Sequence, residues 1–307
     1  MKRFFPLLIV VLFFTACAST ENGQALLGAP DSPVIFSLDG ERVTAADFAT
    51  RLERDIGANI ANLIAQGSSP AEIEQMAAQD NIRGQIFDQM IQDALLTRYA
   101  RQHGIGADPT AVDSAILTTM APAQDSPFVI TAANRVRAAR SQQAIEVIVR
   151  TIRTNMAHVR HILVADEATA TQVLAELSAG GDFATLARTR SLDPIAAAKG
   201  GDLGWLPQGS AFGPEFDKVV FEAPLNTPTQ VSGANGVHVV VVLERQDDRA
   251  FENIEQLRNS PNAQQFYQQS FVPWYAKLRA QAEQSRELQV APNFDPNTVP
   301  LPFPPGT

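Results

Sequence analysis

The stretch that decides the fold covers residues 159–245 and contains three short segments of distinct character. In chain order they read VRHILV (Val159–Val164), KGGDLGW (Lys199–Trp205) and GVHVVVVL (Gly236–Leu243). The first and third are aliphatic runs rich in β-branched residues, which predict buried strands. Each of these two strands carries one histidine, His161 or His238. The glycines of the middle segment predict a tight turn between them.

In this order the three segments resemble the parvulin-type peptidyl-prolyl cis/trans isomerase domain, and the flanking sequence resembles the chaperone domain of SurA- and PrsA-type extracytoplasmic foldases. The resemblance implies an α+β fold, in which a four-stranded antiparallel sheet flanked by helices is inserted into a mostly helical SurA-like domain. We expect the helical domain over residues 34–157 and the isomerase domain over residues 158–248. A C-terminal helix and strand over residues 249–295 are expected to complete the helical domain.

Composition narrows the classes of partner and of chemistry. The chain has 307 residues and a formal net charge of −9, and Cys17 is its only cysteine. An acidic protein is poorly suited to binding a phosphate backbone, so we expect no nucleic acid partner. A single cysteine excludes an intrachain disulfide and a thiolate metal cluster. We expect neither a metal nor a cofactor.

The N-terminus predicts export and lipid attachment. Lys2 and Arg3 precede the apolar run Phe4–Phe14, which is too short to span a bilayer. Phe14 to Cys17 (FTAC) resembles a bacterial lipobox, which implies a signal peptide over residues 1–16, lipidation of Cys17 and a flexible tether over residues 17–33. A plain signal peptide or a short N-terminal anchor are the alternatives. The resemblance places the protein in the bacterial cell envelope facing the periplasm, and Ala18 favours the outer membrane.

Outside the isomerase-like region the sequence predicts helices. Thr44 with Asp47, and Ser69 before Pro70, are helix-start signals. A helix is expected over residues 131–156, with an inner side formed by Val136, Ile145, Val149 and Ile152. The proline-rich residues 296–307 are expected to be a disordered tail.

The resemblance also implies the polar residues of the site. It makes His161 and His238 a pair on neighbouring strands, hydrogen-bonded to each other or to a nearby hydroxyl. Asp193 occupies a position where some parvulins carry cysteine, so the resemblance implies a carboxylate at the site and no nucleophile. The alternatives are two satisfied core histidines, and a loop acid that caps the next helical turn.

A proline pocket and a substrate-facing wall are expected beside these polar residues. The resemblance makes Leu203, Phe212 and Phe216 the pocket, although counting from Gly209 would place Ala211 where Phe212 is expected. The segment TPTQVSGANGV (Thr227–Val237) departs from the family pattern. Asn235 stands where the family has an aromatic residue, and the hydroxyl expected nearby must come from Ser232 or be missing.

These expectations lead to two functional hypotheses. The first is an isomerase and folding chaperone that acts without covalent chemistry on X–Pro bonds of unfolded exported polypeptides, and that is attached to the membrane through Cys17. The second is a parvulin-like holdase that binds unfolded envelope proteins with little or no turnover. The altered Thr227–Val237 segment is the feature that keeps the second hypothesis open.

Overall fold

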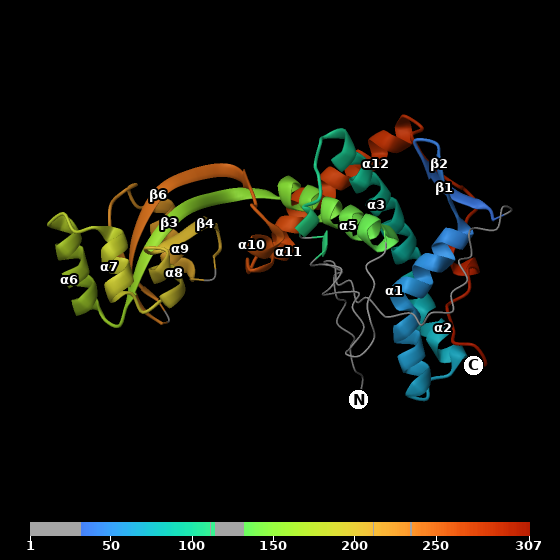
Figure 1. Cartoon of the computed structure of the whole chain (residues 1–307), viewed down its shortest axis with the longest axis horizontal. Coiled ribbons are helices and arrows are strands. Elements are labelled where there is room, and N and C mark those ends of the chain that lie inside the picture. Colours follow the sequence, from blue (N-terminus) through green and yellow to red (C-terminus); the bar gives the residue numbers. More distant parts are fainter. Residues whose placement is uncertain (1–31, 111, 114–131, 211, 234) are drawn as a thin grey trace. The chain divides into compact units, whose positions relative to one another are not determined.

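The computed structural model describes residues 32–110, 112–113, 132–210, 212–233 and 235–307 (Figure 1). The expected signal peptide, Cys17, nearly all of the expected tether and Ala211 therefore lie outside the described residues. The chain divides into two compact units, residues 1–147 with 276–307 and residues 148–275. The second unit thus begins at residue 148 and ends at residue 275, whereas the isomerase domain was expected over residues 158–248.

The first unit contains a small sheet and three successive helices. The helices are α1 (Ala45–Ala65), α2 (Pro70–Gln79) and α3 (Ile82–Gln102). The sheet has β1 (Val34–Leu38) between β2 (Glu41–Thr44) and β7 (Leu288–Val290), all antiparallel. Capping boxes at Thr44 and Ser69 start α1 and α2 where the sequence predicts. Because β7 pairs with β1, both ends of the chain contribute to this unit.

Helix α5 (Ala132–Thr151) differs from its expected form at both its end and its inner side. It stops five residues earlier than expected because the chain becomes extended from Arg153 onward. Val136 was expected to face inward but is 53% exposed. Val136 and Ile145 are nine residues apart, which places them on opposite sides of a helix with 3.6 residues per turn. The buried positions of α5 include Ala138, Val147 and Val149.

The C-terminal residues 296–307 are packed against the helices, in contrast to the expected disordered tail. Leu301 is 4% exposed and shares an apolar cluster with Ile60 of α1 and Ile73 of α2. The buried Arg83 donates from Nε to the carbonyl oxygen of Val299 at 2.8 Å. Proline content alone predicts disorder here, but apolar side chains between the prolines, such as Leu301, are buried against the helices.

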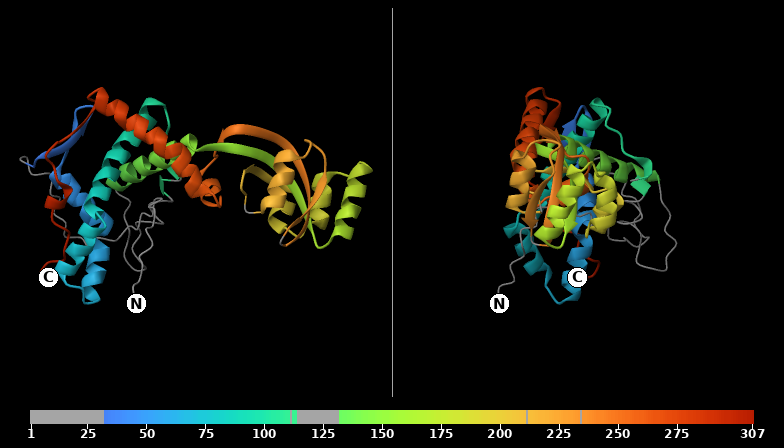
Figure 2. Two further views of the ribbon diagram at one scale, coloured as in Figure 1. Left: turned by 180° about the vertical axis from the view of Figure 1, so that it is seen from behind. Right: turned by 90° about the vertical axis from the view of Figure 1, so that its left-hand side faces the viewer.

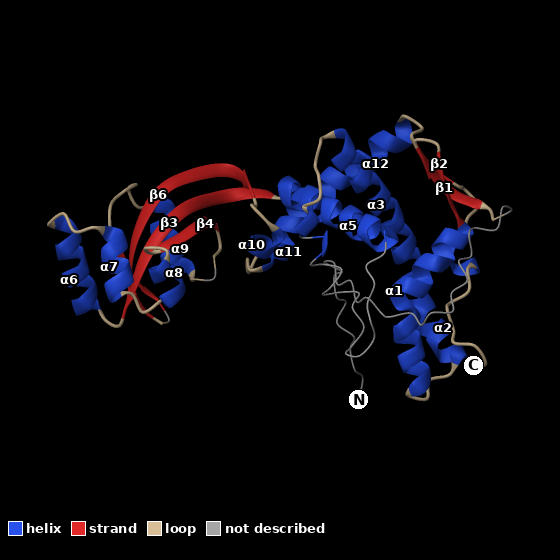
Figure 3. Cartoon of the chain, viewed as in Figure 1, coloured by secondary structure: helices blue, strands red, loops and turns tan. Residues whose placement is uncertain are grey.

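The second unit is built on a four-stranded antiparallel sheet with the order β4-β3-β6-β5 (Figure 3). Its strands are β3 (Arg153–Val164), β4 (Asp202–Pro207), β5 (Thr229–Gly233) and β6 (Gly236–Ala250). The long strands β3 (green) and β6 (orange) run side by side in Figures 1 and 2. The expected four-stranded antiparallel sheet is confirmed.

Helices cover both faces of this sheet. Helices α6 (Glu167–Ser178) and α7 (Phe183–Arg190) pack on the face that presents Ile162 and Val239. Helix α9 (Pro214–Glu222) packs on the face that presents Val159 and Val240. A five-residue helix, α8 (Pro194–Ala198), contacts β3 and β4. Alternation along the strands therefore decides which side chains lie under α9.

The chain after β6 forms further helical turns. They are α10 (Ile254–Arg258), α11 (Ala263–Phe266), a π-helical turn (Tyr267–Phe271) and α12 (Val272–Gln284). Residues up to Tyr275 belong to the second unit, although they were expected to complete the first. Phe251 and Phe266 have ring centroids 5.7 Å apart, so aromatic packing holds α11 close to the end of β6. Among the described residues, no helix combines the length and apolar character needed to cross a bilayer.

Candidate functional site

The two histidines of the strand motifs lie together under α9. Register pairs Leu163 with His238 and His161 with Val240, so the two imidazoles are diagonal neighbours on one face of the sheet. Their Nδ1 atoms are 3.0 Å apart. His161 and His238 are 1% and 5% exposed. The structure therefore brings together the pair that the sequence predicts.

Asp193 joins this pair from the loop between α7 and α8. Its Oδ2 lies 3.0 Å from Nε2 of His161. Its Oδ1 accepts hydrogen bonds from the backbone N–H groups of Ile195 and Ala196 at 3.0 Å, and so caps α8. Asp193 therefore has both of the roles that the sequence left open: Oδ1 caps α8, and Oδ2 contacts His161. Asp193, His161 and His238 thus form a continuous row of contacts, which we call the array.

The loop that carries Asp193 is held firmly on β3. The backbone N–H of Leu192 donates to the carbonyl oxygen of Leu163 at 2.7 Å. The hydroxyl oxygen of Ser191 accepts from the N–H groups of Leu163 at 3.1 Å and of Asp193 at 3.3 Å. Because Leu163 is the register partner of His238, these bonds fix the carboxylate relative to both imidazoles.

Burial keeps both imidazoles neutral at neutral pH. Desolvation lowers the pKa of His161, although the hydrogen bond and charge of Asp193 act against this shift. Desolvation, with a smaller contribution from His161, lowers the pKa of His238 to about 4. Burial acts to raise the pKa of Asp193, but hydrogen bonds from Ala196 and His161 outweigh it and the net shift is downward. The site therefore holds an ionised carboxylate beside two neutral rings.

These states fix the protons along the array. A carboxylate can only accept, so Nε2–H of His161 donates to Asp193. A neutral imidazole has one N–H, so Nδ1 of His161 accepts and Nδ1–H of His238 donates to it. We infer that Nε2 of His238 is unprotonated, which makes it a hydrogen-bond acceptor at the end of the array.

Two phenylalanines from the segment around α9 form an apolar wall against the histidines. The rings of Phe212 and Phe216 stack with centroids 4.6 Å apart. Phe216 lies edge-on to His238 at 5.3 Å, and Phe212 lies edge-on to His161 at 5.7 Å and to His238 at 5.8 Å. Leu203 of β4 packs against the same apolar cluster. Phe212 therefore lies against both histidines, and its alternative, Ala211, lies outside the described residues.

The expected polar wall from residues 227–237 is placed differently. Ser232 is exposed and pairs with Val237, whose side chain lies on the α6 and α7 face of the sheet. Asn235 is an exposed turn residue, and within the described structure neither Ser232 nor Asn235 forms a hydrogen bond with His161 or His238. A one-residue difference in strand register moves a side chain to the opposite face, which accounts for the placement of Ser232.

Gly233 is the residue of this segment that lies against the site, and sequence reasoning missed it. It pairs with Gly236 and is therefore a diagonal neighbour of His238. A Cβ atom at Gly233 would lie 2.8 Å from Nε2 of His238. Because Gly233 has no side chain, the imidazole of His238 can occupy this position without a clash. Counting the register of the β5–β6 hairpin back from His238 is the signal that could have found it.

A second histidine–carboxylate pair on β3 was also missed. Nε2 of His158 lies 2.9 Å from Oδ1 of Asp202, and its ring stacks on Trp205 at 5.5 Å. Ala157 and Val159 belong to the core under α9, so His158 between them faces the other way. The remaining histidine, His103, is exposed in the first unit and stacks on Tyr99.

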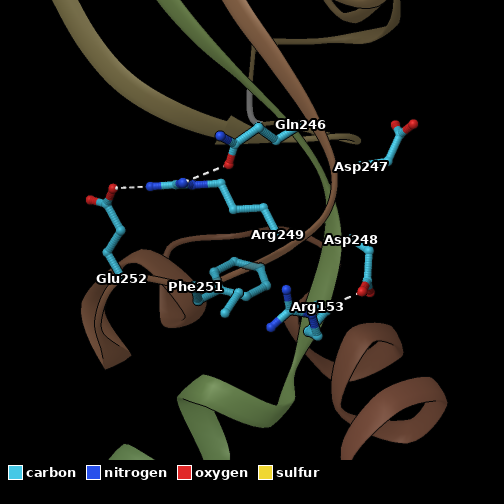
Figure 4. Close-up of a pocket in the computed structure, with 8 residues that line it drawn as sticks. Arg153, Gln246, Asp247, Asp248, Arg249, Phe251 and Glu252 are labelled. Carbon is cyan, nitrogen blue, oxygen red and sulfur yellow. Dashed lines mark hydrogen bonds and ion pairs between the residues drawn. The ribbon is translucent and has the colours of Figure 1, made fainter.

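A pocket of about 480 Å³ lies where the β3–β6 pair ends, away from this array (Figure 4). Charged side chains on its rim pair with one another: Arg153 with Asp248 at 3.0 Å, and Arg249 with Glu252 at 2.9 Å. Figure 4 also shows Arg249 reaching Gln246, at 2.7 Å. Such a lining does not suit a prolyl ring, so we assign the site to the histidine array. Among the described residues, no group of three or more His, Cys, Asp or Glu side chains is arranged to hold a metal.

Two long stretches of the chain match known protein families. Residues 139–246 match the PPIC-type PPIASE domain, and residues 1–131 match the SurA-like N-terminal domain. Foldase protein PrsA of Halalkalibacterium halodurans is 27% identical over 254 residues, 78% of this chain and 71% of that protein. Chaperone SurA of Legionella pneumophila (strain Lens) is 33% identical over 138 residues, 41% of this chain and 32% of that protein.

The crystal structure of the peptidylprolyl isomerase PrsA from Bacillus anthracis is 18% identical, with a TM-score of 0.32, over 68% of this chain and all of that one.

Proposed function

Because this chain carries a PPIC-type parvulin isomerase domain behind a SurA-like N-terminal domain and is homologous to the PrsA and SurA foldases, we propose that the Asp193–His161–His238 array and its phenylalanine wall isomerise X–Pro bonds of unfolded polypeptides. The expected family, fold class and class of enzyme are confirmed by these matches. Relatives named foldase and chaperone also support a role in the folding of exported proteins. The site residues and their roles are our own assignment.

The reaction needs a site that favours a twisted amide over a planar one. Rotation about an X–Pro bond has a barrier of about 18–20 kcal/mol because the C–N bond has partial double-bond character. A site that binds the twisted form more tightly than the planar form lowers this barrier. The prolyl ring requires a close apolar surface, and the half-buried Phe212, which stacks on the fully buried Phe216, offers one beside the histidines.

The array contributes a rigid polar floor without a nucleophile. Asp193 and the neutral imidazoles hold one another in a fixed proton arrangement, so no charge or proton has to move during rotation. A planar amide has a charge-separated resonance form that water stabilises, and a water-poor site weakens that form. The acceptor at Nε2 of His238 and the carboxylate of Asp193 can then orient backbone groups next to the proline.

The observation that carries this proposal is the 3.0 Å contact between the two buried imidazoles under the stacked phenylalanines. Refolding of a reporter protein limited by proline isomerisation tests it. The whole protein should accelerate the slow phase, and Phe216→Ala should remove most of the acceleration. Leu225→Ser, an exposed substitution in the loop after α9, is the matched control and should leave the rate unchanged. No acceleration by the unaltered protein would end the enzymatic assignment.

The holdase alternative is favoured by a specific observation at the wall. Gly233 and the outward Ser232 supply no hydroxyl beside His238, and Phe212 lies across both imidazoles. If the protein is a holdase, the unaltered protein and Phe216→Ala should suppress aggregation of an unfolded client equally. Neither of the two should accelerate X–Pro rotation. Measuring both properties on the same two proteins separates the two functions.

We also propose that the chain is lipid-anchored at Cys17 in the bacterial envelope and faces the periplasm, with the outer membrane favoured by Ala18. Support comes from the sequence, in which the only cysteine follows the apolar run Phe4–Phe14 directly after the small residue Ala16. In a bacterial host, labelled fatty acid should enter the protein but not Cys17→Ser. Ala18→Asp should shift the protein toward the inner membrane fraction, and unchanged fractionation would contradict the outer-membrane assignment.

A further inference from the structure

Asp217, in the first turn of α9, holds the start of the connection that carries Phe212 from β4 to α9. Its Oδ2 accepts hydrogen bonds from the backbone N–H groups of Gly209 at 2.6 Å and of Ser210 at 3.1 Å. Its Oδ1 accepts from the hydroxyl of Ser210 at 2.6 Å. Phe212 is two residues from Ser210 and two from Pro214, the first residue of α9. Because successive Cα atoms are about 3.8 Å apart, a shift of Ser210 also shifts Phe212.

Two amide side chains from the helical turns after β6 also support this connection. Gln256 of α10 donates from Nε2 to the carbonyl oxygen of Trp205 at 2.7 Å, and its Oε1 accepts from the N–H of Glu252 at 2.7 Å. Asn262, which directly precedes α11, lies against Gly209, and a Cβ atom on that glycine would collide with its Nδ2. We call Gln256 and Asn262 the amide brace.

Phe212 needs such support because its own contacts fix it loosely. It is half-buried and lies outside α9, whereas Phe216 is fully buried within that helix. Its ring contacts Phe216, His161 and His238. Aromatic contacts are favourable at centroid separations from about 4.5 to 7 Å, so they leave a ring room to move. At a site that works by positioning, a displacement of about 1 Å can cost about 100-fold in rate.

Resting on the proposed isomerase function, we propose that the amide brace and Asp217 are positioning residues that keep Phe212 beside His238. They act through the backbone of the connection and not by contact with the substrate. The brace lies beyond residue 246, where the match to the PPIC-type domain ends, so this chain adds a support from outside that domain. A merely structural role would lower the free energy of unfolding without moving the Phe212 ring in the folded protein.

Gly209→Ala tests the amide brace, because the new Cβ should push the connection away from Asn262. With the whole protein, kcat/KM for a proline tetrapeptide, measured by NMR exchange spectroscopy, should fall about five- to tenfold. Gly209 has a φ of +82°, so the variant also carries backbone strain. Gly180→Ala is the matched control, because its φ is +93° and a Cβ there would meet nothing within 4 Å. It should stay within about twofold of the unaltered protein.

Single hydrogen bonds of this support are tested by smaller changes. Gln256→Ala removes the donor to the carbonyl oxygen of Trp205. Asp217→Asn replaces one accepting oxygen by an amide group that cannot accept. Each variant should reduce kcat/KM about threefold. Glu255→Ala, an exposed change beside Gln256 that removes a surface pair with Arg258, should leave turnover unchanged.

NMR cross-relaxation between labelled phenylalanine and histidine rings shows whether Phe212 itself moves. In the unaltered protein, the rings of Phe212 and Phe216 lie edge-on to His238, with centroids 5.8 and 5.3 Å away. In Gly209→Ala the cross peak between Phe212 and His238 should weaken, while the cross peak between Phe216 and His238 should keep its intensity.

The outcomes separate this inference from the proposed function. Unchanged turnover in Gly209→Ala, or an equal loss in Gly180→Ala, would overturn the positioning role. Intact cross peaks would overturn it as well, whatever happens to the free energy of unfolding. If the unaltered protein does not accelerate isomerisation, the proposed function fails, and the cross peaks still decide whether the amide brace holds Phe212.

Discussion

Strand β3 carries two histidine–carboxylate pairs three residues apart, and they differ in nearly everything except their chemistry. His161 meets Asp193 at 3.0 Å, and His158 meets Asp202 at 2.9 Å. The imidazole of His161 is 1% exposed, whereas that of His158 is 29% exposed. His161 also contacts a second imidazole and two phenylalanines, while His158 stacks on Trp205.

A histidine–carboxylate pair on its own therefore does not make a site. Alternation along β3 sends His161 into the core under α9 and sends His158 to the other face. Under α9, desolvation lowers the pKa of both His161 and His238, and the contact between their Nδ1 atoms extends the array to a second imidazole. His158 and Asp202 are partly exposed, with side-chain exposures of 29% and 42%, so water competes for their contact, and such surface pairs contribute little to stability.

The largest expected effect is on stability in acid. Unfolded His238 takes up its proton near pH 6.5, and the folded residue does so only near pH 4, so acid favours the unfolded chain across this interval. The free energy of unfolding should therefore be at its full value above pH 6.5, and it should fall by about 3 kcal/mol as the pH drops to 4. Denaturation followed by tryptophan fluorescence measures it, because Trp205 and Trp274 both lie in the second unit.

Two variants attribute that loss to the buried array. His238→Leu should flatten the dependence of unfolding free energy between pH 6.5 and 4, because the titrating ring is gone. His158→Ala should keep the dependence of the unaltered protein. A curve that is equally steep in all three proteins would show that the buried imidazole is not its source.

The next largest effect is on turnover. His161→Ala breaks both hydrogen bonds of the buried array and leaves Asp193 without its side-chain partner. We expect kcat/KM for X–Pro isomerisation to fall about 30-fold, or about 2 kcal/mol. His158→Ala, the matched change on the exposed pair, should stay within about twofold. Comparable losses in both variants would contradict the distinction between the two faces.

A smaller effect is expected from neutralising the carboxylates. Asp193→Asn keeps an oxygen that can cap α8 but removes the charge that orients His161. The activity should fall about tenfold, and the pKa of His161 should move further down because the charge that raises it is lost. NMR titration of the His161 ring checks the second point. Asp202→Asn should change neither quantity, and a change there would argue against separate roles.

The smallest effect is expected at Gly233. A methyl group there would lie 2.8 Å from Nε2 of His238, so the ring must shift. Gly233→Ala should reduce kcat/KM by a few-fold, about 1 kcal/mol, without loss of the second unit's fold. Gly106→Ala, where a Cβ would meet nothing within 4 Å, is the control. Full activity of Gly233→Ala would show that the position of this ring is not critical.

Much of the fold could be predicted because strong local signals agreed with one another. The valine-rich strands that carry His161 and His238 became the central pair β3 and β6. Helix starts at Thr44 and Ser69 follow from capping chemistry that acts within four residues. The C-terminal residues could not be predicted in this way, because burial of Leu301 depends on helices more than two hundred residues away in sequence.

The site was predictable where the family resemblance aligns residues without a gap, and unpredictable where a residue's position depends on the register of the β5–β6 hairpin. His161, His238, Phe216 and Asp193 meet in the structure as the sequence indicates. Ser232 does not join them, because the side of the sheet that it occupies depends on how β5 pairs with β6. Gly233 has no side chain to attract notice, and its importance lies in the space that it leaves.

Cis/trans interconversion of a proline tetrapeptide, measured by NMR exchange spectroscopy with catalytic amounts of the protein, tests the central claim most directly. We expect the unaltered protein to accelerate interconversion, His158→Ala to accelerate it equally, and Phe216→Ala to lose almost all of the acceleration. No acceleration by the unaltered protein, or equal acceleration by all three, would contradict the assignment of the buried face of β3 as an isomerase site.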